Sequence, residues 1–239
     1  MVPGSTIFEA VSQSTDSEPP PLFTSEEEEV LKDLGSIVRF PPGSLIVKEG
    51  EDSDFVVMLH EGHVVIEKGQ PHQLTVGIRG PGELVGEMAC LIRKPRTASI
   101  RSIGEVEAQL IPARDWRAFL HEHPRAMSAQ IYQLGLRLDE ATRIGADSLL
   151  TSEQTLIKAM VKLVDSGLGA EEKGGHMTFK NLSQMALAKM ANISRESAIQ
   201  VLRRLKTERL VDTGRQRLTI LDLAALRGLA DDVGSAAKQ

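Results

Sequence analysis

The spacing of the apolar residues changes once along this chain, and that change restricts the folds it can adopt. Over residues 36–114 the apolar residues form short runs rich in Val and Ile, separated by turns such as Pro-Gly, Glu-Gly and Lys-Gly. Such runs predict an antiparallel roll or barrel. From Asp115 the spacing becomes helical. A chain of 239 residues is too long for one minimal core and corresponds to one large or two ordinary domains. Together with the change in pattern, this predicts an α+β protein with two domains.

The predicted domain boundaries follow these changes in pattern. The N-terminal residues are rich in Ser, Pro, Thr and Glu, so we expect them to form a disordered tail. Thr24 or Ser25 then caps a short acidic helix. We expect the tail over residues 1–22, the roll domain over 23–123, a long helix over 124–150 and a helical domain over 151–239.

The long helix carries apolar or small side chains spaced alternately by four and three residues. This spacing is a heptad seam, which favours pairing with an identical helix and therefore a homodimer. The alternative is a helix that packs only on its own domain. The seam residues are Met127, Ile131, Leu134, Leu138, Ala141, Gly145 and Ser148.

The last part of the chain has the pattern of a winged helix-turn-helix. After a Gly-rich loop at 166–175 we predict a short strand at 176–180 and two amphipathic helices separated only by Asn192 and Ile193. Ser194 is a candidate N-cap for the second helix, since its hydroxyl can accept a backbone N–H bond. A hairpin turning at Gly214 and a last helix from about Leu223 follow.

The charges support a nucleic-acid-binding role for this second domain. Residues 1–150 hold 14 basic and 23 acidic side chains, whereas residues 180–217 hold 9 basic and 3 acidic ones. A basic segment in an acidic protein indicates a nucleic-acid-binding module, and the alternative is a solvated helix face. With the helix-turn-helix pattern, the expected partner is double-stranded DNA. The predicted DNA contacts are Ser194, Arg195, Glu196, Ser197, Ile199, Gln200, Arg203 and Arg204, with Arg215 and Arg217 in the wing.

Composition excludes several other classes of protein. Aromatic residues make up 3% of the chain, which argues against stacking surfaces for single strands. A single cysteine, Cys90, excludes a disulfide framework or an all-cysteine cluster, and we expect it to be a packed thiol. No apolar run is long enough for a membrane span, and the N-terminus lacks a signal-peptide pattern, so a cytoplasmic protein is expected.

Catalysis and resident cofactors find no support in the sequence. No nucleophile–base pairing and no Walker-type loop stands out, so the chain is not expected to be an enzyme. We expect no metal and no haem, because the four histidines in question are predicted to be exposed loop residues. They are His60, His63, His121 and His123.

One connection in the roll has the residues needed to bind a cyclic phosphate. Gly86 and Glu87 begin a short helical turn, and Arg96 follows nine residues after Glu87, in the segment GPGELVGEMACLIRKPRTASI. A buried phosphate needs an Arg donor and free backbone N–H groups, and a ribose hydroxyl needs a carboxylate acceptor. The alternative is a structural turn with an Arg–Glu ion pair.

This segment resembles the phosphate-binding cassette of cyclic-nucleotide-binding domains. The order of roll, cassette, long helix, helix-turn-helix and wing is similar to the cyclic-AMP receptor protein/fumarate-nitrate regulator (Crp–Fnr) family, over about residues 23–225. The resemblance implies a homodimeric transcription factor that responds to cyclic AMP, or otherwise cyclic GMP or a cyclic dinucleotide, and works with RNA polymerase. The implied ligand-binding residues are Gly86, Glu87, Met88, Ala89, Arg96, Thr97, Ala98 and Thr142.

Three positions depart from the family pattern. Val85 stands where the cassette usually has Phe, and Ala141 replaces the first of two hydroxyl residues that contact the base, while Thr142 keeps the second. Gln200 stands where the receptor protein has an Arg that reads DNA. Two alternatives therefore stay open: a family member that needs no effector, and a cyclic-nucleotide sensor whose basic C-terminal domain docks on a protein.

Overall fold

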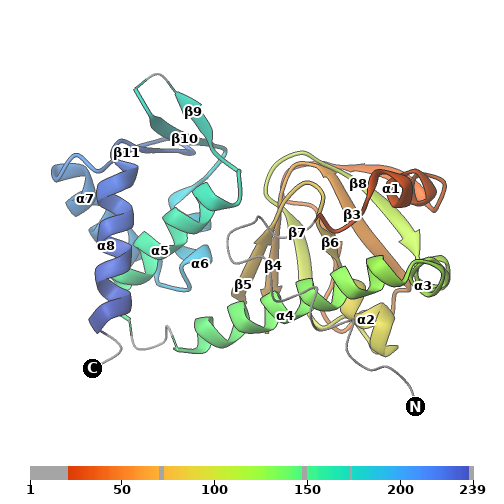
Figure 1. Ribbon diagram of the computed structural model, residues 1–239. Helices are drawn as coiled ribbons and strands as arrows, with labels where there is room; N and C mark the ends of the chain where they lie inside the picture. Colours follow the sequence, from red (N-terminus) through yellow and green to blue (C-terminus); the bar gives the residue numbers. More distant parts are fainter. Residues whose placement is uncertain (1–20, 70–72, 147–149, 173, 237–239) are drawn as a thin grey trace, which may run out of the picture.

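A computed structural model describes residues 21–69, 73–146, 150–172 and 174–236 of the chain. Almost all of the predicted tail, and Ser148 of the predicted seam, lie outside these residues. Figure 1 shows a β-rich domain and a mainly helical domain, with the long helix α4 (Pro124–Ala146) running along the β-rich domain toward the helical one.

Two four-stranded antiparallel sheets form the N-terminal roll, as the sequence predicts. One sheet has the order β1-β8-β3-β6 and the other β2-β7-β4-β5. Their inward-facing Val, Leu and Ile side chains form one core, which includes Val57, Leu59, Val64 and Ile100. The strands are β1 (Ser36–Phe40), β2 (Leu45–Val47), β3 (Phe55–Glu61), β4 (Val64–Lys68), β5 (Leu74–Arg79), β6 (Leu84–Val85), β7 (Ser99–Ser102) and β8 (Val106–Pro112).

A second core joins α1 (Ser25–Lys32), α3 (Ala113–Glu122) and the start of α4 to the roll. The Phe23 and Trp116 rings meet edge to face at 6.0 Å, and Trp116 stacks on Phe119 at 5.6 Å. Arg125 of α4 forms an ion pair with Glu27 of α1, and this contact lowers the pKa of the Glu27 carboxyl. The start of α4 is therefore fixed to the N-terminal domain.

The C-terminal domain packs its helices against a small sheet of order β11-β12-β10-β9. Its core includes the buried side chains of Leu156, Phe179, Leu202, Leu205 and Ile220. Strand β9 lies in the loop that the sequence pattern predicts to be irregular, and β10 pairs with it. The elements are α5 (Ser152–Asp165), β9 (Ala170–Glu172), β10 (His176–Lys180), α6 (Gln184–Met190), α7 (Arg195–Thr207), β11 (Val211–Gly214), β12 (Arg217–Ile220) and α8 (Leu223–Ala236).

Helices α6 and α7 form the helix-turn-helix, and local backbone preferences determine its turn. Asn192 adopts a left-handed conformation with φ 53°, which Asn tolerates better than most residues. The Ile193 N–H donates to Ala188 O across the end of α6. Ser194 then caps α7 as predicted, because its Oγ accepts the Ser197 N–H at 3.0 Å.

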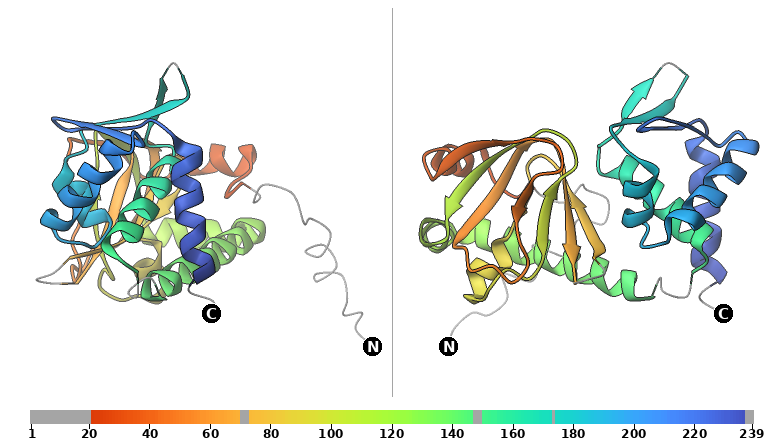
Figure 2. Two further views of the ribbon diagram at one scale, coloured as in Figure 1. Left: turned by 90° about the vertical axis from the view of Figure 1, so that its left-hand side faces the viewer. Right: turned by 180° about the vertical axis from the view of Figure 1, so that it is seen from behind.

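Helix α4 has one buried side and one exposed apolar side. Ala126 and Gln130 are buried against the N-terminal domain, whereas Ile131 is 64% exposed and Leu138 70% exposed. Met127 and Ala141 are also exposed, and Leu134 is half-buried. The residues of the predicted seam that the structure describes thus lie mainly on the side of α4 that does not touch its own domain. Figure 2 shows this helix at the edge of the molecule.

Among the described helices, none has the length and apolar character that crossing a lipid bilayer requires.

Candidate nucleotide-binding and DNA-binding sites

The cassette begins at a glycine with a left-handed backbone. Gly86 follows β6, has φ 78° and is the N-cap of the short helix α2 (Glu87–Ile92). Glu87 is 2% exposed, Ala89 is buried and Met88 points to the surface. This sharp turn lets the β6 strand lead directly into a helix with a buried carboxylate in its first turn.

Arg96 is 3% exposed, and three of its nitrogens donate to acceptors of the roll. Nε donates to Ser53 Oγ at 2.7 Å, Nη1 to Gly86 O at 2.8 Å and Nη2 to Phe55 O at 2.6 Å. The guanidinium also lies 4.6 Å from the centre of the Phe55 ring. The structure therefore brings Arg96 to the start of α2, as a buried cation held by neutral acceptors.

Glu87 forms an ion pair with the long helix and not with Arg96. Arg137 Nη1 lies 2.5 Å from Glu87 Oε1, and Arg137 Nη2 donates to Leu84 O at 2.7 Å. Arg137 Nε is buried and has no hydrogen-bond partner in the part of the chain that the structure describes. The predicted alternative of an Arg–Glu ion pair is thus present, but its arginine is Arg137, which is not among the residues predicted for the site. Its signal in the sequence is a basic residue on α4 next to the apolar seam.

The other predicted ligand residues lie around this centre or on α4. Thr97 and Ala98 are half-buried and follow Arg96 directly. Thr142 is exposed on α4, and its hydroxyl donates to Leu138 O at 2.9 Å. Its exposure leaves it open to a molecule packed on that side of the helix.

Cys90 lies beside Arg96 but is not a reactive thiol. It is buried, and its Sγ donates to Phe55 O at 3.2 Å. Burial raises the pKa of the thiol, although Arg96 opposes this shift. A protonated, packed thiol is a weak nucleophile. The packed thiol predicted from the sequence is thus confirmed.

Among the predicted DNA-contacting residues of α7, one group is exposed to solvent, and the other is half-buried or belongs to the helix cap. Arg195, Glu196, Gln200 and Arg203 are exposed, and spacings of three and four residues place Glu196, Gln200 and Arg203 on one side of the helix. Ile199 is half-buried, and the Ser194 and Ser197 hydroxyls bond to each other at 2.9 Å as part of the cap.

The remaining basic residues have acidic neighbours within the domain. Arg204 forms ion pairs with Glu153 of α5 at 2.5 Å and with Glu208 at 2.9 Å. Arg217 of the wing lies 3.7 Å from Asp212, and Arg215 is exposed between the two wing strands. Arg204 therefore has a structural contact, while Arg215 is open to solvent.

The expectation that the four histidines are exposed loop residues is wrong for His60, His63 and His123, which are half-buried, while His121 is exposed but lies in the last turn of α3. His60 lies in β3 and is 3.3 Å from Gln109 Oε1, and His63 Nε2 is 2.8 Å from Ser166 O of the C-terminal domain. The His123 ring stacks on Phe119 at 4.5 Å. Among the described residues, no group of three or more His, Cys, Asp or Glu could hold a metal ion.

Two family models match the two domains. The cyclic nucleotide-binding domain matches residues 37–123, and the Crp-like helix-turn-helix domain matches residues 156–229. The chain belongs to the Crp–Fnr family of transcriptional regulators. Members of this family bind DNA, typically as dimers.

Relatives that match over most of their length are transcription regulators. The chain is 26% identical to the CRP-like cAMP-activated global transcriptional regulator of Mycobacterium tuberculosis, over 69% of this chain and 75% of the relative. It is also 26% identical to the cyclic AMP receptor protein of Thermus thermophilus, over 80% of this chain and 86% of the relative.

Solved structures share the fold. A transcriptional regulator of the CRP family from Thermus thermophilus gives a TM-score of 0.69 at 25% identity, covering 81% of this chain and 96% of the other. The c-di-GMP responsive regulator CLP of Xanthomonas campestris gives a TM-score of 0.72 at 21% identity, and the match covers 83% of this chain and 100% of the other.

The close contact between Gly86 and Arg96 gives a testable prediction. A Cβ at Gly86 would lie 2.6 Å from Arg96 Nη1, whereas a Cβ at Gly82, which also has a positive φ, would meet nothing within 4 Å. Gly82→Ala should lower the free energy of unfolding by about 1–2 kcal/mol through backbone strain alone. Gly86→Ala should cost about 1.5–3 kcal/mol more, because it also disturbs the hydrogen bonds of a buried cation. Denaturant unfolding followed by Trp116 fluorescence measures both, and equal losses would contradict the assigned role of this contact.

Proposed function

We propose that this protein is a homodimeric transcriptional regulator whose DNA binding is controlled by a cyclic nucleotide, with cyclic AMP as the first candidate. The observation that carries the proposal is the buried pair of charged groups at the start of α2, Arg96 and Glu87. The match of this domain to the cyclic nucleotide-binding family supports it. The name of the Mycobacterium tuberculosis relative, a cAMP-activated regulator, supports cyclic AMP.

The hydrogen bonds of Arg96 allow a bound phosphate to replace some of its present acceptors. In the structure two of its nitrogens donate to the neutral carbonyl oxygens of Gly86 and Phe55. A cyclic phosphate is an anionic acceptor, and charge-assisted hydrogen bonds are about twice as strong as neutral ones. The phosphate would therefore take over part of the Arg96 donors, while Glu87 accepts from the ribose hydroxyl.

Arg137 connects the proposed site to the long helix. It donates to Glu87 in the cassette and belongs to the same helix as Glu140. Arg79 Nη2 of β5 donates a hydrogen bond to Glu140 Oε2 at 2.8 Å, and Glu140 also forms an ion pair with Lys162 of α5. Burial alone would raise the pKa of Glu140, but Arg79 and Lys162 outweigh it and lower the pKa, so the group is charged at neutral pH. A ligand that changes the Glu87–Arg137 contact would thus bias the position of the C-terminal domain.

The exposed side of α4 supports the homodimer. Ile131 and Leu138 are large apolar residues left in water by the isolated chain, and they belong to a spacing suited to an identical helix. In such a dimer Thr142 would reach the nucleotide of the partner subunit. We place the regulator in the cytoplasm, where it would act on DNA together with RNA polymerase.

A cyclic dinucleotide is the second candidate effector. Ala141 cannot supply a hydroxyl to the adenine, so one of the base contacts that the family resemblance implies is missing. The Xanthomonas campestris protein of the same fold is named as c-di-GMP responsive. Cyclic GMP is a third candidate, because the Thr97 hydroxyl could meet the 2-amino group of a syn guanine.

Substitution of Arg96 tests the nucleotide site. Arg96→Ala should weaken cyclic AMP binding by about 2–5 kcal/mol, which is about 1.5 to 3.5 decades in affinity, because a buried anion loses its charged partner. Lys94→Ala removes an exposed charge nearby and should have little effect. Isothermal calorimetry gives the affinities, and Trp116 fluorescence verifies folding. A folded Arg96→Ala protein that binds cyclic AMP as tightly as wild type would contradict the site.

The DNA site preference tests the role of α7. We expect Arg195 to donate to a guanine and Glu196 to accept from a cytosine, while Gln200 pairs most naturally with adenine. Selection from random DNA should give a two-fold symmetric site. Gln200→Arg should change the preference at one base-pair step from A·T toward G·C, with a discrimination of about 1–3 kcal/mol between the two.

Arg215→Ala is the control for this experiment, since loss of a phosphate contact should weaken all sequences alike. Identical half-sites for wild type and Gln200→Arg would show that Gln200 does not read a base. A selected site with a single half-site would contradict the dimer.

A further inference from the structure

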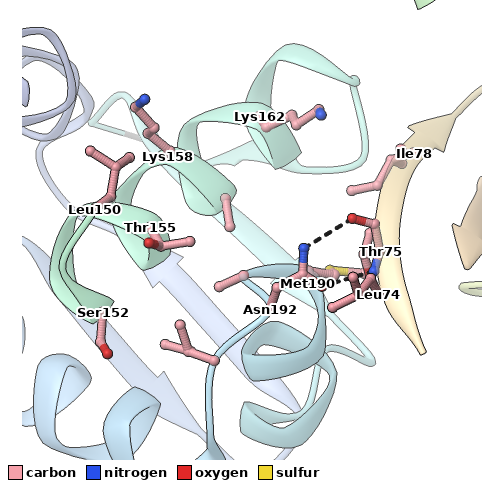
Figure 3. Close-up of a pocket in the computed structure, with 14 residues that line it drawn as sticks. Leu74, Thr75, Ile78, Leu150, Ser152, Thr155, Lys158, Lys162, Met190 and Asn192 are labelled. Carbon is pink, nitrogen blue, oxygen red and sulfur yellow. Dashed lines mark hydrogen bonds between the residues drawn. The ribbon is translucent and has the colours of Figure 1, made fainter. Parts of the chain in front are cut away.

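The two domains meet at the free edge of β5. This strand is the last in the order β2-β7-β4-β5, so one edge has no neighbouring strand among the described residues. The Thr75 N–H donates to Asn192 Oδ1 at 2.8 Å, and Asn192 Nδ2 donates to Thr75 O at 3.1 Å. Both bonds are drawn in Figure 3. The Thr75 hydroxyl adds a bond to Lys189 O at 3.2 Å.

The side-chain amide of Asn192 makes the two hydrogen bonds that a neighbouring strand would make with Thr75. Its amide has the donor and acceptor of a peptide group, and it satisfies both backbone groups of one edge residue. Nearby, Ile78 of β5 packs in the core of the C-terminal domain, and His63 bonds Ser166 O. The edge of the roll and the helix-turn-helix are therefore held by a specific contact.

This contact is incompletely packed. A cavity of about 430 Å³ lies beside it, lined by residues of β5, α5 and the helix-turn-helix turn (Figure 3). Permanent interfaces resemble close-packed protein interiors. The pocket leaves part of this interface without apolar contact, so the hydrogen bonds of Asn192 are a specific part of what holds the two domains together.

The position of Asn192 gives the contact a consequence for DNA binding. Asn192 lies two residues before Ser194, the cap of α7, and the N-terminal residues of a recognition helix enter the major groove. The groove is about 8.5 Å deep, so entry brings the turn before the helix to the groove rim beside the phosphates. In the structure the backbone of β5 occupies the space next to this turn.

We propose that the β5 edge is an autoinhibitory latch, which holds the helix-turn-helix turn through Asn192 and must release it before DNA can bind. The inference rests on DNA binding through α7, but it does not depend on which effector controls the protein. Because the coupling is reciprocal, DNA and the latch compete for the same turn.

Asn192→Gly removes both bonds and keeps the turn, since glycine adopts the left-handed backbone of Asn192 freely. Without nucleotide, this variant of the full chain should bind a pool of random-sequence duplex DNA about tenfold more tightly than wild type, from the loss of two hydrogen bonds. The matched control is Asn181→Gly, an exposed asparagine with φ 59°, which should leave the affinity unchanged.

Hydrogen exchange gives a second readout that needs no effector. The Thr75 amide should exchange faster in Asn192→Gly than in wild type, and saturating DNA should speed its exchange in wild type. Unchanged protection in the DNA complex, or DNA affinity that stays the same or falls in Asn192→Gly, would overturn the latch. Failure of cyclic AMP to bind would contradict only the proposed effector, because both measurements are made without nucleotide.

Discussion

The buried guanidinium of Arg96 is the interaction on which the effector domain depends. A cation removed from water is costly unless its donors are satisfied, and here Ser53, Gly86 and Phe55 supply the acceptors. These acceptors come from the loop before β3, the first residue of β3 and the turn before α2. The same group therefore fixes the local backbone and places a buried positive charge at the proposed nucleotide site.

Ion pairs along helix α4 connect this centre to the rest of the molecule. Its start is fixed by the Glu27–Arg125 ion pair, and Arg137 ties its middle to Glu87 of the cassette. Near its end, Glu140 contacts Arg79 and Lys162, which belong to different domains. Contacts along α4 therefore join the segment around Glu87 to the C-terminal domain.

Sequence patterns predicted the features that depend on neighbouring residues. The strands of the roll, the cap at Ser194 and the last helix from Leu223 follow from local periodicity and capping. The Glu87–Arg137 pair joins residues 50 positions apart, and the Thr75–Asn192 pair joins residues 117 apart. Such contacts depend on how the domains pack, so local patterns could not predict them. The prediction for His63 was wrong for the same reason, because its partner Ser166 is 103 residues away.

If the segment around Arg96 binds a cyclic mononucleotide, as we propose, calorimetry of the full chain should detect the binding. Titration with cyclic AMP, cyclic GMP and cyclic di-GMP compares the candidate effectors under one set of conditions. We expect cyclic AMP to bind most tightly, with one molecule per chain. Binding of cyclic di-GMP alone, or of none of the three nucleotides, would contradict this proposal.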